Sequence, residues 1–357
     1  MMNYRLKISA NDDSSKISLK GLGLNYSGVT EISSEKTRSL ATLYYGQQWT
    51  KKDISLFGEI EEKLIPIDAT AHYNTLLPIY RKTLGQYIFQ HILPKNVANA
   101  IQSLPTGSIL KLEVDQNVSH VPWELMYTGH NYLCLEHILG RVSSTQKNSP
   151  EPVNGSISML LVSNPTLDLY GSQNEANYII NQLRGSRMRI TRYGFEIKKD
   201  DYLKLLESGN FQVVHYSGHS GSSPEPGKCC HEFKDKLCYG SEIEALNIKI
   251  PPFLVFSNSC QSAEDSIEEE ETGNTSLAGS YLKAGVGGCV GTIWTVSDKA
   301  SGMFASDFYR HLLFGSTIGE ALYNARRTSF KRWGYSDFIW GSYILFGDPE
   351  IRLVKRN

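Results

Sequence analysis

From residue 156 to the carboxyl terminus, short apolar runs of strand length alternate with amphipathic segments of helical length. This alternation restricts the fold more than any other feature, because a strand–helix–strand repeat places successive strands parallel in one sheet. The predicted strands are 157–162, 188–193, 211–216, 253–257, a glycine-rich run within 286–296, and 343–346. The predicted helices are 174–183, 199–206, 277–284, 299–314 and 317–331. The sequence therefore predicts an α/β fold with a mostly parallel sheet and helices on both faces.

The amino-terminal segment, residues 1–65, has a different pattern. Apolar residues alternate with polar ones, as at Tyr4, Leu6 and Ile8, and this period of two is typical of strands with one buried face. A further apolar run covers 40–45. We predict a small β-rich segment here. The pattern fits both an accessory binding module and a regulatory flap.

Residues 66–155 form the second predicted part. Apolar residues recur at helical spacing over 69–104, and an apolar strand follows at 108–114. The polar run 143–155 contains two prolines and is typical of a linker. We therefore predict a mainly helical part that ends at this linker, followed by the α/β part at 156–357.

The composition excludes several classes of protein. Hydrophobic residues make up 40% of the 357 residues and charged residues 20%, which allows a sizeable core. The formal net charge of -1 gives no basic excess for binding nucleic acid or a membrane surface. No apolar run approaches the ~20 residues that span a bilayer, and the amino terminus lacks a secretory core. We expect a cytoplasmic protein with neither nucleic acid nor membrane as a direct partner.

The six cysteines are too few for a disulfide scaffold. Cys229, Cys230, His231 and Cys238 lie close together in sequence, which raises the question of a zinc site. Adjacent cysteines followed at once by histidine do not match the usual spaced ligand pairs. We predict a surface loop with incidental thiols and no metal. The chain also lacks a GxxxxGK phosphate-binding loop, and we predict no cofactor.

Two of the predicted strands end at residues that could do chemistry together. The run at 211–216 leads through Ser-Gly to His219, and the run at 253–257 leads to Cys260. If the strands are parallel neighbours, both side chains emerge at the carboxyl edge, where open α/β sheets place their sites. A thiol beside an imidazole is the minimum for a cysteine nucleophile. The alternative is a buried thiol at a strand end and a histidine of the core.

Five short motifs give the chain a specific resemblance. They are Pro-Trp-Glu-Leu at 122–125, Tyr-Ser-Gly-His at 216–219, Ser-Asn-Ser-Cys at 257–260, Gly-Thr-Ile-Trp-Thr-Val-Ser-Asp at 291–298 and Phe-Gly-Asp-Pro at 346–349. In this order the motifs resemble the CHAT domain, a branch of the caspase–separase superfamily of cysteine peptidases, over about residues 70–354. The resemblance implies a caspase-like fold, with a catalytic part at 156–357 and a pseudo-caspase-like half before it.

The resemblance also implies a catalytic dyad, which by motif falls on His219 and Cys260. The Cys260 thiolate would attack a peptide carbonyl, while His219 takes the thiol proton and later protonates the leaving amine. The backbone N–H groups of Gly218 and Cys260 would hold the oxyanion. His215, four residues before His219, is predicted to be a core or supporting histidine and is the alternative base. His120 and His231 are predicted to lie in loops.

The similar separases place an acidic residue opposite a basic side chain of the substrate. Asp298, after the strand that contains Trp294, is the candidate here. A buried carboxylate at this place would select Arg or Lys through charge-assisted hydrogen bonds. The alternative is that Asp298 only caps the helix that follows, a position where Asp is favoured.

A block of acidic residues follows Cys260, with six acids among the eight residues of 264–271. Such a block is typical of a solvated loop. Because no Lys or Arg lies between Lys249 and Lys283, self-cleavage after a basic residue is not expected there. We predict that substrate or a partner orders this loop, or that its charge attracts a basic substrate segment. The alternative is a surface loop without a role.

Two classes of function remain. The first is an endopeptidase with a protein substrate, held inactive until a sensor or activating protein switches it on. CHAT relatives often act in prokaryotic defence or cell death, and the resemblance extends that context, including antiviral defence, to this chain. The second is a catalytically idle scaffold for protein–protein interaction. An acyl transferase or another thiol hydrolase is disfavoured only by the resemblance.

Overall fold

The computed structural model describes residues 2–10, 14–31, 34–45, 81–143, 150–222, 229–259, 276–294, 296 and 298–355. The chain forms two compact units. Unit 1 comprises Met1–Leu139 and Phe330–Gly341, and unit 2 comprises Gly140–Ser329 and Ser342–Asn357. The three parts expected from sequence, at 1–65, 66–155 and 156–357, remain a prediction.

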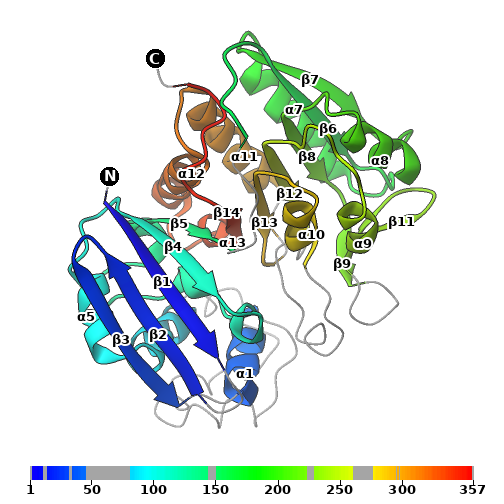
Figure 1. The fold of residues 1–357 in the computed structure, drawn as a ribbon. Helices are drawn as coiled ribbons and strands as arrows, with labels where there is room; N and C mark the ends of the chain where they lie inside the picture. Colours follow the sequence, from blue (N-terminus) through cyan, green and yellow to red (C-terminus); the bar gives the residue numbers. More distant parts are fainter. Residues whose placement is uncertain are drawn as a thin grey trace. The chain divides into compact units, whose positions relative to one another are not determined.

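The described residues of unit 1 include the strands β1 (Asn3–Ala10), β2 (Ser14–Gly21), β3 (Leu24–Glu31) and β4 (Ile109–Val114). They lie in the order β3-β2-β1-β4, with β1 antiparallel to β2 and parallel to β4 (Figure 1). The predicted alternation places Tyr4, Leu6 and Ile8 in the core, because side chains of a strand point to alternate faces.

The apolar run at 40–45 is not a further strand but the end of helix α1 (Ser34–Tyr45). Thr37, Leu40 and Ala41 are buried, and their spacing of three and four residues places them on one helical face. Within its described residues, the amino-terminal segment contains a helix beside its strands.

The described part of the stretch 69–104 is mostly helical, in agreement with the spacing of its apolar residues. Helical residues 81–87 continue into the π-helical turn η1 (Ile88–Ile92), and α5 (Lys95–Gln102) begins after Pro94. Short turns follow at η2 (Gln116–Val118), η3 (Trp123–Leu125) and α6 (Leu133–Glu136). Trp123 has no exposed surface and donates its indole N–H to the Val118 carbonyl at 2.9 Å. The Pro-Trp-Glu-Leu motif is thus part of the core of unit 1.

The strands of unit 2 form a mostly parallel array, as predicted. Its strands are β6 (Ile157–Ser163), β7 (Met188–Tyr193), β8 (Val213–Ser217), β12 (Leu254–Asn258), β13 (Gly288–Thr292) and β14 (Tyr343–Gly347). They lie in the order β14-β13-β12-β8-β6-β7, all parallel except β14, which is antiparallel to β13. Arg141 of β5 (Ile138–Arg141) pairs with Phe346.

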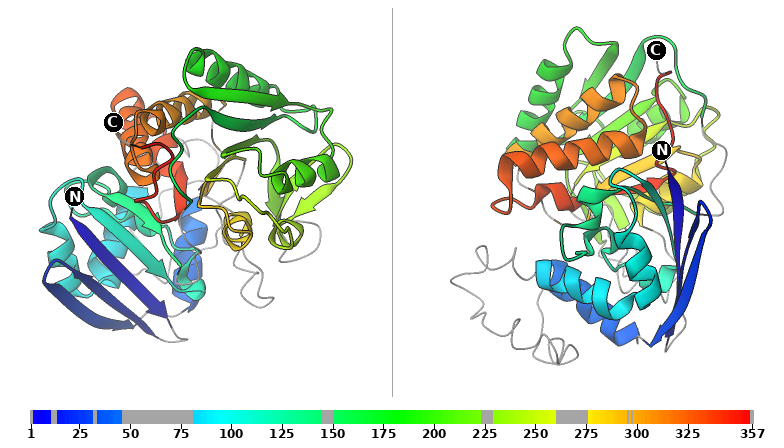
Figure 2. Two further views of the ribbon diagram at one scale, coloured as in Figure 1. Left: turned by 45° about the horizontal axis from the view of Figure 1, so that its top comes forward. Right: turned by 90° about the vertical axis from the view of Figure 1, so that its left-hand side faces the viewer.

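Helices cover both faces of this sheet. On one face α7 (Tyr170–Leu183) and α11 (Asp298–Leu313) lie side by side (Figure 1, Figure 2). On the other face α8 (Lys199–Glu207), α9 (Gly240–Glu244) and α10 (Leu277–Lys283) enclose an apolar cluster with the sheet. The helices α12 (Ile318–Trp333) and α13 (Ile339–Ser342) precede β14. The predicted fold class, a mixed α/β fold with a mostly parallel sheet, is confirmed.

A second, three-stranded sheet replaces the surface loop predicted for the cysteine-rich stretch. The strands β9 (Ser220–Ser222), β10 (Cys229–Glu232) and β11 (Leu237–Tyr239) lie in the order β11-β10-β9. Cys230, His231 and Cys238 are buried, so the prediction of an exposed loop was wrong. The thiols act as small apolar side chains, which the sequence pattern did not distinguish from ligands. Among the described residues, no three of His, Cys, Asp and Glu converge as a metal site.

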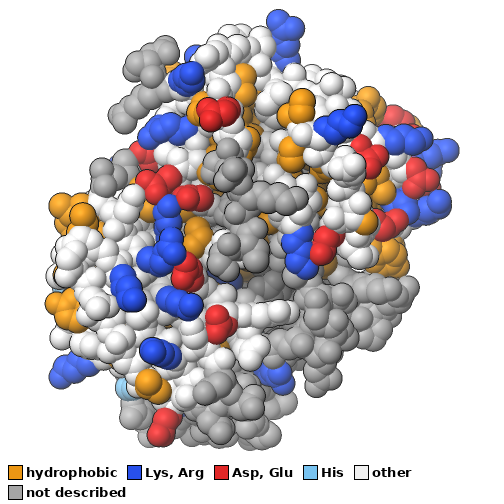
Figure 3. Space-filling view, in the orientation of Figure 1, with side chains coloured by type: hydrophobic (Ala, Val, Ile, Leu, Met, Phe, Trp, Pro, Cys, Tyr) orange, Lys and Arg blue, Asp and Glu red, His pale blue; other side chains and the backbone are white. Residues whose placement is uncertain are grey.

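The surface carries both signs of charge. Figure 3 shows Lys and Arg side chains interspersed with Asp and Glu on the visible face, in line with the net charge of -1. Within the described ranges, no helix combines the length and apolar character needed to cross a membrane.

Candidate functional site

The carboxyl ends of β8 and β12 lie next to each other. The strands are hydrogen-bonded in parallel, and Ser217 is the register partner of Asn258. His219 follows Ser217 by two residues, and Cys260 follows Asn258 by two residues. The predicted side-by-side arrangement of the two strands is therefore present. Cys260 itself lies outside the described residues, so its pairing with His219 stays a prediction.

His219 has a fixed backbone and a half-exposed side chain. Its carbonyl oxygen accepts a hydrogen bond from the Glu232 N–H at 3.0 Å. The Tyr216 hydroxyl shares its one proton between this oxygen, at 2.9 Å, and the Glu232 carbonyl, at 2.8 Å. A Cβ added at Gly218 would lie 2.8 Å from the Tyr216 hydroxyl oxygen and 3.0 Å from Cδ of Pro165. Only glycine fits this position, because anything larger would displace the hydroxyl that holds the histidine backbone.

Asp168 is the carboxylate that contacts His219, and the sequence analysis missed it. The His219 Nε2 lies 3.1 Å from Asp168 Oδ2. The Thr166 hydroxyl donates to Asp168 Oδ1 at 2.5 Å, and this hydrogen bond is the main cause that lowers the pKa of Asp168, with a contribution from His219. The Asp168 side chain is 62% exposed, so the pair is a surface interaction. Asp168 follows β6, a third strand that ends at the same edge of the sheet. This position after a strand could have identified Asp168 in the sequence.

The loop that carries Asp168 has an unusual backbone. Asn164 and Leu167 both adopt left-handed conformations, with φ of 53° and 70°. Such conformations are costly for residues other than glycine and cluster at functional sites. The Asn164 side-chain oxygen accepts a hydrogen bond from the Leu169 N–H at 2.8 Å, and the backbone N–H of Asn164 donates to the Ser217 carbonyl. Asn164 thus anchors the loop to the end of β8.

Ser259, the residue before Cys260, is held from several strands. Its hydroxyl oxygen lies 2.6 Å from that of Ser220 and 2.7 Å from that of Ser257. Its carbonyl accepts a hydrogen bond from the Thr292 hydroxyl at 2.6 Å, at the end of β13. The chain is therefore fixed up to the residue that precedes the predicted nucleophile.

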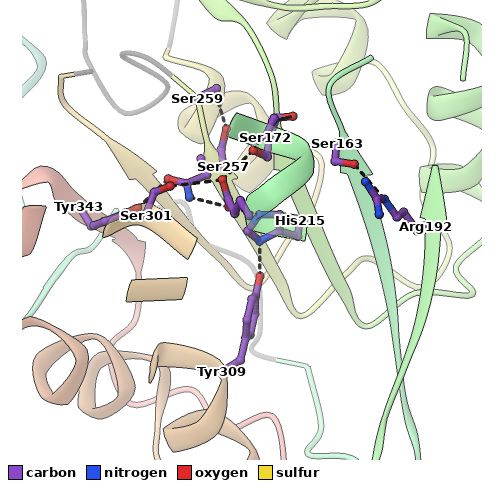
Figure 4. A network of polar contacts seen from close by, with 12 residues as sticks. Ser163, Ser172, Arg192, His215, Ser257, Ser259, Ser301, Tyr309 and Tyr343 are labelled. Carbon is purple, nitrogen blue, oxygen red and sulfur yellow. Dashed lines mark hydrogen bonds and ion pairs between the residues drawn. The ribbon is translucent and has the colours of Figure 1, made fainter. Parts of the chain in front are cut away.

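His215 is a core residue, as predicted. It has no exposed surface, and both ring nitrogens have partners (Figure 4). Nδ1 lies 2.8 Å from the Tyr309 hydroxyl, and Nε2 lies 2.8 Å from Glu175 Oε1. Burial raises the pKa of Tyr309, so its hydroxyl is neutral and can donate to Nδ1. This enclosed ring has no open nitrogen with which to serve as the alternative base.

The remaining predicted site residues have different outcomes. Asp298 is the first residue of α11, which agrees with a position at the helix start, but its side chain lies outside the described residues. Its pocket role and its capping role both remain predictions. The acidic block at 264–271 lies outside the described residues as well. His120 is buried in the loop between η2 and η3, whereas His231 lies in β10, so the prediction of a loop for His231 was wrong.

Comparisons with known proteins agree with this architecture. The family model of the CHAT domain matches residues 82–348. Two crystal structures of the Saccharomyces cerevisiae separase–securin complex superpose with TM-scores of 0.60 and 0.55, at 13% and 14% sequence identity. Each match covers 97% of this chain but only 30% of the other chain. A solved structure of a protease gives a TM-score of 0.52 at 12% identity, covering 77% of this chain and 69% of that one. Among curated proteins, none matches by sequence.

Proposed function

The chain belongs to the CHAT-domain family, and from this premise we propose that it is a cysteine endopeptidase with Cys260 as nucleophile and His219 as proton carrier. The observation that carries the proposal is the register of β8 and β12. Ser217 and Asn258 are paired, and each stands two residues before one member of the dyad. Parallel neighbours with this register deliver both side chains to one edge of the sheet.

The proposed reaction proceeds through an acyl-enzyme. His219 takes the thiol proton, and the Cys260 sulfur forms a bond to the carbonyl carbon of the substrate. The C–N bond then breaks as His219 gives the proton to the leaving amine. Water, deprotonated by His219, then attacks the carbonyl carbon of the thioester. The C–S bond breaks, the carboxylic acid product leaves, and His219 returns its proton to the Cys260 sulfur. The N–H groups of Gly218 and Cys260 are proposed to stabilise the oxyanion in both steps.

Asp168 would orient the imidazole in this reaction. It contacts Nε2 of His219 at 3.1 Å. If Nε2 carries a proton and donates it to this carboxylate, Nδ1 is left free to accept the proton of Cys260. The second nitrogen of a histidine commonly fixes its tautomer in this way. In this arrangement the dyad does the chemistry, and the exposed carboxylate of Asp168 holds the imidazole of His219 in the required tautomer.

The substrate preference and the regulation of the enzyme are proposed from its family. We propose that Asp298 selects Arg or Lys at the cleavage position through a charge-assisted contact. We further propose a cytoplasmic enzyme that an associated sensor or activating protein switches on, in a prokaryotic defence or cell-death pathway. The separase neighbours were solved together with securin, which supports the expectation of a protein regulator. The acidic block at 264–271 is the proposed contact for such a partner or for a basic substrate segment.

The test is labelling of the full chain with a peptidyl acyloxymethyl ketone that carries arginine at the cleavage position. We expect a covalent adduct on Cys260 in the wild type and none in His219→Ala. An unmodified Cys260, or equal labelling in His219→Ala, would contradict the proposal and favour an idle scaffold. Co-expression of wild type or Cys260→Ala with neighbouring gene products, followed by mass spectrometry of new amino termini, identifies the protein substrate.

A further inference from the structure

A buried carboxylate lies beneath the edge of the sheet that carries the predicted dyad. Glu175, on α7, is only 4% exposed. Its oxygens accept hydrogen bonds from Asn258 Nδ2 at 2.6 Å, from the Ser217 hydroxyl at 2.8 Å and from His215 Nε2 at 2.8 Å. The Ser301 hydroxyl of α11 lies 3.4 Å away. The acceptor sites of one carboxylate are thus filled from two strands and a neighbouring helix.

Two of these donors lie at the strand ends that lead to the predicted catalytic residues. Ser217 and Asn258 are register partners at the ends of β8 and β12. They precede His219 and Cys260 by two residues each. A single carboxylate therefore bridges the last residues of the two strands from which the predicted catalytic side chains emerge.

The surroundings keep the carboxylate of Glu175 in place. The Tyr343 hydroxyl donates to Asn258 Oδ1 at 2.7 Å, which turns the amide nitrogen toward Glu175. A Cβ added at Gly302 of α11 would lie 3.3 Å from the Glu175 Cα, so the two helices approach closely here. Figure 4 shows the side chains of His215, Ser301, Tyr309 and Tyr343 gathered around this network.

A buried carboxylate is an expensive way to stabilise a core. Removing a charge from water costs several kcal/mol, and apolar residues of similar volume often stabilise a protein as much or more. Its advantage is geometric, because charge-assisted hydrogen bonds are short and directional. Glu175 is thus better explained by the spacing that it imposes on the two strand ends than by its contribution to stability.

We propose that Glu175 is a positioning residue, which fixes the ends of β8 and β12 relative to each other and thereby sets the geometry between His219 and Cys260. This inference rests on the proposed function, and it adds a residue that touches neither substrate nor the reacting atoms. It predicts that the reactivity of the Cys260 thiol depends on a hydrogen-bond network on the opposite side of the strands from the apolar cluster of α8, α9 and α10.

The test is the rate at which iodoacetamide alkylates Cys260 in the full chain, measured between pH 5 and 9. The reaction needs no peptide substrate. Trypsin releases residues 250–283 as one peptide in which Cys260 is the only cysteine, so mass spectrometry follows this thiol alone. Glu175→Gln keeps the size of the side chain but places an amide N–H against one of the donors.

We expect Glu175→Gln to lower the alkylation rate constant at pH 7 by at least about tenfold, a fraction of the ~10²–10⁴-fold that a positioned proton carrier contributes. The pH midpoint of alkylation should move upward, because a displaced imidazolium stabilises the thiolate less. The double variant Glu175→Gln with Asn258→Asp exchanges the acid and the amide, and we expect it to recover part of the rate.

Tyr202→Phe is the matched control. It removes the buried hydrogen bond between the Tyr202 and Tyr281 hydroxyls on the other face of the sheet, and it should leave the rate and the midpoint unchanged. If Glu175→Gln does not fold, Ser217→Ala removes one donor with a smaller change and should move the midpoint in the same direction. Unchanged kinetics in the folded variant overturn the positioning role.

The two proposals fail in different ways. If wild type and His219→Ala alkylate at the same rate, the dyad is refuted and the positioning role falls with it. If His219→Ala slows the reaction but Glu175→Gln and Ser217→Ala do not, the peptidase stands and Glu175 is an ordinary core residue.

Discussion

Acid should destabilise unit 2 through a single buried histidine. His231, on β10, has no exposed surface, and neither ring nitrogen has a hydrogen-bond partner among the described residues. The centroid of its ring lies 3.8 Å from that of the Tyr216 ring, and the ring centroids of Tyr202 and Tyr281 lie within 6.5 Å. Burial raises the pKa of these three tyrosines and of Cys238 opposite in the register, so none supplies a negative charge.

Burial lowers the pKa of His231 from 6.5 to about 3. Between these values the unfolded chain binds a proton that the folded chain does not, so the free energy of unfolding falls as the pH falls below 6.5. One pKa unit corresponds to ~1.4 kcal/mol, so the loss at pH 5 is about 2 kcal/mol. The loss should continue to grow until about pH 3, where the folded protein also takes up the proton.

The assay is urea unfolding of wild type and His231→Leu at pH 7.5 and pH 5. We expect the variant to lose about 2 kcal/mol less than wild type between the two conditions, because it has no proton to take up. His137→Leu makes the same test in unit 1, because burial lowers the pKa of His137 to about 4. We expect this variant, too, to lose less stability than wild type between pH 7.5 and pH 5. A variant with the same acid sensitivity as wild type would refute the reasoning, whatever its stability at pH 7.5.

Three further predictions concern the site. Asp168→Ala should slow alkylation of Cys260 by only about two- to fivefold, because exposed ion pairs contribute ~0.2–1 kcal/mol, and a hundredfold loss would show that its role is larger. Gly218→Ala should abolish labelling by the peptidyl electrophile, since the added methyl group would meet the hydroxyl that anchors the histidine backbone, 2.8 Å away; Gly155→Ala, with nothing within 4 Å of its added Cβ, is the control and should label normally. Asp298→Ala should lose preference for Arg and Lys in a peptide library at unchanged thiol reactivity, and a preserved preference would leave Asp298 as a helix cap only.

The sequence predicted much of the sheet of unit 2 well because β6, β8 and β12 are buried on both faces. Such strands are continuous apolar runs, and these three differ from their predicted bounds by at most two residues. The strand β7, in which several side chains are exposed, has the predicted bounds as well. The prediction that His219 and Cys260 lie close together uses the rule that parallel strands share a carboxyl edge, and the described ends of β8 and β12 are register partners. The local sequence pattern was enough to propose these residues because they directly follow predicted strands.

Glu175 was missed although a signal for it existed. The buried residues of α7 include Ser172, Glu175, Ala176, Ile179 and Leu183, which recur at helical spacing. An acid on the apolar face of a helix needs a partner, and that conflict identifies the position. Its hydrogen-bond partners lie on strands far from it in the sequence, however. The sequence could therefore have identified Glu175 but not the residues that bind it.

The small sheet was mispredicted for a different reason. Its strands are only three or four residues long, too short for periodicity to be recognised. They are also rich in thiols and imidazole, which suggest chemistry rather than packing. Cys238 is buried in the apolar cluster that contains the tyrosines of α8, β8 and α10, and nothing local in the sequence encodes that packing.

The two hydrogen bonds that converge on the carbonyl of His219 restrict how this centre can be regulated. With the main chain clamped at that atom, the imidazole can still swing about its own side-chain torsions. The activating partner proposed above could then act by selecting one rotamer of this ring, a change that is fast, reversible and small in the backbone. Side-chain resonances of His219 would consequently report on the on-state and the off-state more faithfully than any comparison of chain traces.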